Sequence, residues 1–146
     1  MDSDIRQLVK EVLEKGYLMS LATADDKGVW VCDVIYIHDE NLNIYWTSNP
    51  EVRHSQAIFK NKQVAASITV SGPKEDNLGV QLEGEVEKME GNQIDLLKKH
   101  YAKRGKDEPV DAPDVLMGSS WYVLKPKSIE LINEKLYGFE KKKLEL

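Results

Sequence analysis

The residues Leu78-Gly79-Val80-Gln81-Leu82-Glu83-Gly84-Glu85-Val86-Glu87 form the most regular pattern in this chain. Leucine and valine recur at every second position on one face, while glutamine and glutamate occupy the other. A period of two residues is that of a β-strand with one face on a core and the other toward water or a partner. Gly84 interrupts the pattern, which predicts a bulge or a close approach of a backbone or ligand, and a second chain could supply that approach.

The segment before this strand predicts a helix and a hairpin. Residues 5–13 have apolar side chains at helical spacing, and Gly16 follows as a natural helix stop. Residues 17–23 and 29–38 are rich in apolar, β-branched and aromatic residues and flank the turn at 25–28. We therefore expect the two runs to pair as a β-hairpin.

Further strands and helices complete the prediction. The expected strands are residues 42–47, 64–70 and 121–132, and the last of them is interrupted near Pro126. One expected helix runs from residue 49 or 50 to about residue 60, and another begins at an Asn92 cap and ends at Gly105. Short turns link most strands, so the sequence predicts a mainly β (α+β) fold, a six-stranded antiparallel sheet closed into a small barrel with peripheral helices. Such barrels often dimerise, and the acidic face of the Gly84 strand is a candidate contact.

Composition limits the function. With 146 residues, 41% hydrophobic and 31% charged, the chain fits a single globular domain, residues 1–146. A net charge of −5 argues against nucleic-acid binding, which needs clustered lysine and arginine. The lone Cys32 excludes an internal disulfide, and no apolar run is long enough to cross a membrane. We therefore expect a cytoplasmic protein without nucleic-acid or membrane partners.

Common catalytic and metal motifs are absent from the sequence. His38, His54 and His100 fall in different elements, and no His-x-x-x-His or Cys-x-x-Cys pair occurs, so we expect no metal site. Cys32 lies within an apolar strand, which favours a packing role over nucleophilic catalysis. Glycine-rich nucleotide loops are also missing.

The segment Thr47-Ser48-Asn49-Pro50-Glu51-Val52-Arg53-His54 follows an apolar strand and predicts a helix start at residues 49 to 50. Pro50 suits the first helical position, and one of the two residues before it supplies a capping oxygen. Arg53 and His54 then lie near the positive end of the helix dipole, where a cation is mildly unfavourable. A bound phosphate would resolve this conflict, and so would neighbouring carboxylates on a solvated surface. These residues alone leave both interpretations open.

Three segments together resemble the pyridoxamine 5′-phosphate oxidase-like split barrels, an FMN-binding superfamily. Tyr45-Trp46-Thr47-Ser48 followed by Arg53-His54 is similar to its flavin-phosphate segment. Residues 79–88 are similar to its Val-x-Val-Glu-Gly-x-Val-Glu strand, and residues 124–131 to its closing Leu-x-Pro-x-x-Ile-Glu-Phe strand. Order and spacing agree over about residues 5 to 133. Residues 79–91 and 136–142 most resemble a small uncharacterised bacterial branch.

The resemblance implies a split β-barrel homodimer with two FMN sites at the dimer interface. It also implies which residues bind FMN. The residues beside the isoalloxazine would be Cys32, Asp33, Val34, Trp46 and Gln81. The residues at the phosphate and ribityl chain would be Thr47, Ser48, Arg53 and His54. Trp121 would cover the flavin from the other subunit.

The sequence departs from the family at four points. Trp121 is shifted by two places from the family's partner-chain tryptophan. His54 replaces a lysine of the family. Gln81 is displaced by two residues, or about 7 Å, from the position of the family's glutamine. The C-terminal Arg-x-His segment that binds vitamin B6 substrates in the family is missing from residues 133–139. The sequence therefore predicts an FMN-dependent oxidoreductase with an unknown small-molecule redox substrate that is not a pyridoxamine phosphate oxidase, with no catalytic residue assigned. Two alternatives stay open: a non-catalytic flavin-binding or stress-related dimeric module, and a relative that uses haem or a deazaflavin.

Overall fold

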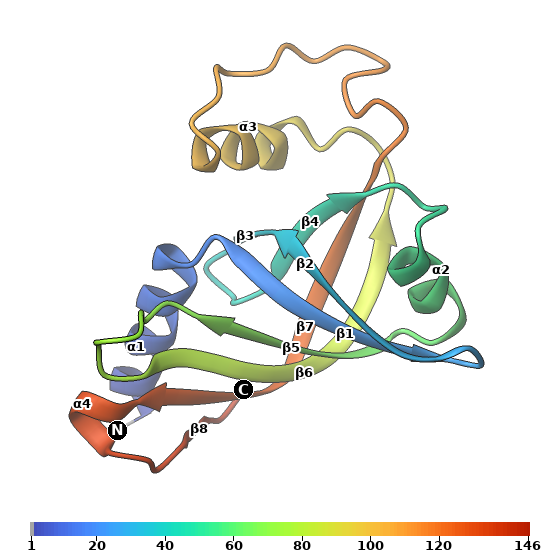
Figure 1. The fold of residues 1–146 in the computed structure, drawn as a ribbon. Helices are drawn as coiled ribbons and strands as arrows, with labels where there is room; N and C mark the ends of the chain where they lie inside the picture. The colour runs from blue at the N-terminus through green and yellow to red at the C-terminus, as the bar shows by residue number, and fades with distance from the viewer. Residues whose placement is uncertain (1) are drawn as a thin grey trace.

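Antiparallel strands form one curled sheet in the computed structural model, which describes residues 2–146 (Figure 1). The strands are β1 (Leu18–Asp25), β2 (Gly28–Ile35), β3 (Ile37–His38), β4 (Ile44–Ser48), β5 (Gln63–Thr69), β6 (Leu78–Met89), β7 (Ser120–Asn133) and β8 (Lys142–Leu144). Their order is β2-β1-β5-β6-β7-β4-β3, and β8 pairs with β7. The helices are α1 (Asp2–Lys15), α2 (Arg53–Lys60), α3 (Ile94–Lys103) and α4 (Glu134–Tyr137). The predicted mainly β fold is confirmed.

The described residues contain eight strands instead of the predicted six. One extra strand, β8, lies near the C-terminus, and the other arises because the expected strand 29–38 breaks at Tyr36. Tyr36 is fully buried, and its hydroxyl donates a hydrogen bond to the carbonyl of Leu13 at 2.7 Å. Beyond this anchor the chain leaves β1 and pairs with β4, at the opposite end of the strand order.

The main core lies inside the curled sheet. It is built from alternate residues of the strands and from one face of α1, which includes Ile5, Val9, Val12 and Leu13. Helix α2 packs on β1 and β2, whereas α3 stands apart over β3 (Figure 1). A second, smaller cluster around Leu97 and Trp121 joins α3 to β7. Helix α2 is therefore held against the sheet at the end where β4 stops.

Gly84 marks a bulge, as the sequence predicted. The register of β6 against β7 shifts between Glu83 and Gly84, and Gly84 faces Pro126. A Cβ added at Gly84 would collide with the carbonyl of Lys125. The approaching backbone therefore belongs to β7 of the same chain and not to a second chain. Strand β7 continues through Pro126, but its pairing with β6 skips Lys127, so the ladder is irregular where the sequence predicted an interruption.

We expect Gly84→Ala to destabilise the protein by about 2 to 3 kcal/mol, because the added methyl group must push β7 away from β6. The melting temperature should fall by about 5 to 10 °C, measured by circular dichroism. Gly72→Ala is the matched control, since its Cβ would meet only the flexible side chain of Glu75. Equal melting temperatures for the two variants would contradict the tight packing at Gly84.

Two helix starts differ from the prediction. Helix α2 begins at Arg53, after a turn, and α3 begins at Ile94. Gln93, and not Asn92, occupies the N-cap position of α3 and makes no side-chain capping bond. The Asn92 amide instead donates hydrogen bonds to Asp111 and to the carbonyl of Ala112, at 3.0 and 2.8 Å.

The acidic face of β6 is paired within the chain. Glu85 accepts from Lys127 and lies 3.4 Å from Lys62, and Glu87 pairs with Lys125. These lysines neutralise most of the charge that had suggested a partner contact on this face.

No helix among residues 2–146 combines the length and apolar character that a membrane crossing requires.

Candidate functional site

The turn between β4 and α2 leaves the start of α2 open. Asn49 accepts a hydrogen bond from the backbone N–H of Glu51 at 2.8 Å, forming an Asx turn, so the helix begins three or four residues later than predicted. Val52 occupies the N-cap position with extended backbone and supplies no capping oxygen. The first turn of α2 contains no acidic residue. Its backbone N–H groups and the positive end of its dipole are therefore available to an anion.

Ser48 and His54 meet at this turn. The Ser48 hydroxyl and Nε2 of His54 lie 2.8 Å apart and share a hydrogen bond. Burial lowers the pKa of His54 below its usual value, which keeps the ring neutral at neutral pH. The pair thus contributes hydrogen-bonding groups more than charge.

Arg53 supplies the positive charge. Its guanidinium lies 4.2 Å from the ring centroid of Trp30, a half-exposed residue of β2, in a cation–π contact. A cavity of about 360 Å³ lies beside it, between α2 and the β1–β2 hairpin, and is lined by Asp25, Lys27, Glu51, Arg53, Gln56 and Lys60. The Trp30 contact holds the Arg53 head group beside this cavity, next to the open start of α2.

Asp33 and Gln81 share one row on the outer face of the sheet. The register places Asp33 opposite Ser20, Ser20 opposite Ser67, and Ser67 opposite Gln81. The Ser20 hydroxyl donates to Asp33 at 2.7 Å. Asp33 and Gln81 are thus three strand spacings apart, about 14 Å. Small side chains between them leave this face shallow.

Other predicted site residues lie inside the protein. Val34 and Trp46 belong to the main core, where Trp46 stacks on Tyr122 with 6.0 Å between ring centroids. Trp121 is fully buried in the second cluster, and its Nε1–H donates to the carbonyl of Asn92 at 2.7 Å. Neither tryptophan faces an open surface of the subunit.

Cys32 and Thr47 lie half-buried at intermediate positions. Burial, assisted by the charge of Asp33, raises the pKa of Cys32 to about 11. The thiol is therefore protonated at neutral pH and packs against the main core, which agrees with the packing role that its apolar strand favoured.

Comparison with known proteins identifies the fold. No family model matches the chain. One solved structure superimposes on 99% of this chain and 93% of its own with a TM-score of 0.78 and 18% identity. A Listeria innocua protein described as a candidate pyridoxamine 5′-phosphate oxidase gives a TM-score of 0.71 at 16% identity, covering 88% of this chain and 98% of its own. General Stress Protein 26 from Bacillus anthracis also gives 0.71, at 14% identity over 97% and 98%. The chain has the fold of the pyridoxamine 5′-phosphate oxidase-like split barrels.

The sequence relatives of this split barrel are UPF0306 proteins, a small uncharacterised bacterial family, as the sequence predicted. YhbP of Escherichia coli O157:H7 is 28% identical over 134 residues, covering 89% of this chain and 85% of that protein. YhbP of Escherichia fergusonii is 31% identical over 96 residues, and this match spans 63% of the chain and 64% of the relative, just under two thirds of its length.

The structural neighbours of this split barrel differ in the ligands that their names state. HutZ from Vibrio cholerae, a haem storage protein, has a TM-score of 0.64 at 14% identity over 81% of this chain and 87% of its own. An F420 reductase has a TM-score of 0.66 at 18% identity over 82% and 94%. At these identities the likeness concerns the fold, so the ligand must be inferred from the residues of this chain.

The sequence prediction placed Cys32, Asp33 and Val34 of the edge strand β2 in the site but missed the residues at the start of this strand. Val29, Trp30 and Val31 are three consecutive apolar residues of β2 with 80%, 46% and 61% exposure. An edge strand with one face on the core and one face in water alternates apolar and polar residues. Three consecutive apolar residues directly after the Gly28 turn therefore indicated that the outer face of this strand also contacts something other than water.

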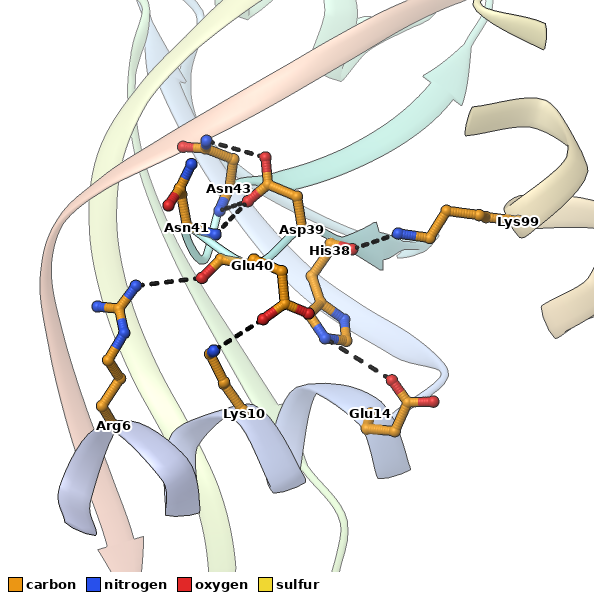
Figure 2. Close-up of polar contacts among 9 residues, drawn as sticks. All are labelled: Arg6, Lys10, Glu14, His38, Asp39, Glu40, Asn41, Asn43 and Lys99. Atoms are coloured by element: carbon orange, nitrogen blue, oxygen red, sulfur yellow. Dashed lines mark hydrogen bonds and ion pairs between the residues drawn. The ribbon is translucent and has the colours of Figure 1, made fainter. Parts of the chain in front are cut away.

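A second polar region of the split barrel ties α1 and α3 to the β3–β4 turn (Figure 2). Its members are Arg6, Lys10, Glu14, His38, Asp39, Glu40, Asn41, Asn43 and Lys99. Lys10 pairs with Glu40 at 2.9 Å, Glu14 lies 3.7 Å from His38, and Lys99 donates to the carbonyl of His38 at 3.0 Å. A cavity of about 420 Å³ adjoins this cluster. Because these groups bond to one another, we interpret the cluster as structural. Residues 2–146 also contain no group of three metal-ligating side chains.

Proposed function

We propose that this chain binds FMN at the β4–α2 turn and acts as a flavin-dependent oxidoreductase on a small-molecule substrate. The observation that carries the proposal is the uncapped first turn of α2, with Arg53 beside it and Ser48 at the end of β4. Backbone N–H groups, a guanidinium and a hydroxyl are the donors that a phosphate requires, and no acidic residue of the first turn repels it. The FMN phosphate would bind Arg53, His54, Ser48 and Thr47.

Strand β2 would hold the ring end of the cofactor. Among the described residues, β2 pairs only with β1, so its other edge offers free backbone N–H and C=O groups beside Cys32, Asp33 and Val34. Gln81 lies in the same row as Asp33 and would mark the far limit of the pocket. FMN, when bound, supplies the redox chemistry, and the residues of the chain bind it, orient it and limit its contact with water.

A homodimer would complete the site. Val29 and Val31 expose apolar surface on β2, and the small side chains of Ser20 and Ser67 make the adjoining sheet face flat. A second copy of the chain would cover this face and enclose the ring between subunits. Because Trp121 is buried under α3, the exposed Trp30 is the better placed tryptophan to contact a flavin. The cytoplasmic location expected from the sequence stays a prediction.

We expect the protein to sediment at about twice the 16.6 kDa of one chain, and Val31→Lys to sediment as a monomer. The lysine would place a charge in the buried apolar contact, where it has no partner. Sedimentation equilibrium measures both masses. Val110→Lys is the matched control, because Val110 is 81% exposed in the loop after α3 and should leave the dimer intact. A monomeric wild-type protein, or a dimeric Val31→Lys variant, would contradict this interface.

The cofactor proposal is tested by the absorption spectrum of the purified protein and by titration with FMN. We expect a flavin spectrum, or binding of added FMN at micromolar concentration with quenching of its fluorescence. A protein that shows neither contradicts the proposal, and a haem spectrum would assign it to the ligand class of the HutZ neighbour. Oxidation of NADPH or NADH by the FMN-loaded protein then separates an oxidoreductase from a non-catalytic flavin-binding module.

A further inference from the structure

The cavity beside the polar cluster of Figure 2 lies between α1, β3 and α3. Its volume of about 420 Å³ is within the range of small-molecule sites. Its walls include Glu14 of α1, His38 of β3, and Lys99 and Lys103 of α3. None of these residues is proposed to bind FMN, and none lines the cavity beside Arg53. The cavity is therefore separate from the proposed cofactor site.

Lys103 is a half-buried lysine of this cavity without a carboxylate partner. Its Nζ donates a hydrogen bond to the carbonyl of Tyr36 at 2.7 Å and lies 3.6 Å from the centroid of the Tyr36 ring. No ion pair within 4 Å involves it among residues 2–146.

This environment makes Lys103 a nucleophilic amine. Burial lowers the pKa of Lys103 to about 8, although the charge of Glu14 acts in the opposite direction. About a tenth of the amine is therefore neutral at pH 7, against less than about 0.1% for an exposed lysine. A lysine in a partly desolvated cavity is the kind that forms imines with carbonyl compounds, because only the neutral amine attacks.

Lys99 places a second amine at the same cavity. It lies one helical turn before Lys103, so both side chains leave the same side of α3. Its Nζ donates to the carbonyl of His38 at 3.0 Å (Figure 2), two residues along the chain from the carbonyl that Lys103 contacts. Two residues span at most about 7 Å, and an ammonium group has three N–H donors. One small ligand can therefore contact both amines.

The two carboxylates at this cavity are directed to other partners. Glu14 lies 3.7 Å from Nε2 of His38, and Glu40 pairs with Lys10 at 2.9 Å. Neither carboxylate is bonded to Lys99 or Lys103, so both lysines stay available to a ligand.

We propose that Lys103 forms a reversible imine with a small 2-oxo acid bound in this cavity. The neutral amine would attack the carbonyl carbon and form a C–N bond, and the carbonyl oxygen would leave as water with the two amine protons. The Lys99 ammonium would hold the carboxylate of the 2-oxo acid by a charge-assisted hydrogen bond. Hydrolysis reverses the step, which needs neither an oxidant nor FMN.

Reductive trapping with pyruvate tests this site. Sodium cyanoborohydride reduces the imine to a stable carboxyethyl-lysine, and peptide mass spectrometry locates the modified residue. We expect Lys103 to be labelled at least about tenfold faster than Lys98. Lys98 is an exposed lysine of the same helix and pairs with Glu108 at 3.2 Å. Equal labelling of the two lysines, or no labelling of Lys103, would overturn the proposal.

The carboxylate contact is tested by Lys99→Met. This variant should slow the labelling of Lys103 by pyruvate about tenfold and leave labelling by propanal, which has no carboxylate, unchanged. Lys74→Met, in the exposed loop between β5 and β6, is the matched control and should alter neither rate. An unchanged rate with pyruvate in Lys99→Met would overturn the assignment of the ligand as a 2-oxo acid.

Lys103→Arg keeps a donor for the carbonyl of Tyr36 but cannot form an imine. It should lose the label at residue 103, whereas Lys98 should be labelled as in the wild-type protein. An FMN titration of the same samples separates the two proposals. Labelling of Lys103 without FMN binding would contradict only the cofactor, and FMN binding without labelling would contradict only the imine site.

Discussion

Replacing Arg53 by alanine should weaken FMN binding about 30- to 100-fold and leave folding nearly unchanged. A charge-assisted hydrogen bond between guanidinium and phosphate contributes about 2 to 3 kcal/mol, which corresponds to that loss of affinity. Arg53 is exposed and its main contact is the ring of Trp30, so its removal should cost less than about 1 kcal/mol of stability. Fluorescence titration with FMN gives the affinity, and thermal unfolding gives the stability.

The control for this variant is Arg6→Ala. Arg6 lies on α1 and donates to the carbonyl of Glu40, in the polar cluster of Figure 2, so its loss removes the same charge far from the proposed phosphate. Arg53→Lys should fall between the two, because lysine keeps the charge but lacks the planar fork. If Arg53→Ala binds FMN as tightly as the wild-type protein, the phosphate binds elsewhere.

The stability of the protein should fall by about 3 kcal/mol as the pH is lowered from 6.5 to 4. His100 is buried against Trp121, and burial, assisted by the nearby charge of Arg104, lowers its pKa to about 4. Between pH 6.5 and 4 the unfolded state holds the proton and the folded state does not. The stabilisation is therefore complete above pH 6.5 and is lost as the pH falls toward 4.

Several charges face His100 and act in the same direction. Arg104, Lys103 and Lys106 all oppose protonation, and only the carbonyl of Ile35, 3.3 Å from Nε2, favours it. His54 and His38 also have pKa values lowered by burial and should add smaller contributions of the same sign.

Urea unfolding at a series of pH values measures this effect. His100→Gln keeps a donor for the carbonyl of Ile35 but cannot titrate, so it should flatten the pH dependence by about 1.4 kcal/mol per pH unit between the two pKa values. Lys98→Gln, on the same helix, removes no histidine and should retain the wild-type slope. A wild-type slope in His100→Gln would show that the acid sensitivity has another origin, and NMR titration of the His100 ring gives its pKa directly.

Most of the fold could be predicted from local patterns. The alternation in residues 78–87, the turn before Gly28 and the helical spacing before Gly16 each identify an element, because a strand or helix must bury one face with its own period. The start of α3 was wrong because Gln93, and not Asn92, occupies its N-cap position. The start of α2 was wrong because an Asn-Pro pair can form an Asx turn as well as an N-cap. Local residues do not decide between the two outcomes.

The candidate site was predicted only in part. Ser48, Arg53 and His54 are close in the sequence, so their proximity at one turn followed from the chain itself. Trp30 lies more than twenty residues before Arg53, and only the docking of α2 against β2 brings the two side chains together. The buried positions of Trp46 and Trp121 were likewise not predictable, because an aromatic residue in a strand can face either side until the register is set.

The sequence by itself determined most of the elements, the bulge at Gly84 and the run of residues after β4 that could bind an anion, because each depends on contacts within a few residues or on one repeating period. Only the tertiary structure decided that β7 is the backbone that approaches Gly84, and that α2 starts without a cap beside Trp30. These features join segments tens of residues apart. Their geometry follows from how the sheet curls and where α2 packs, and no local pattern contains that information.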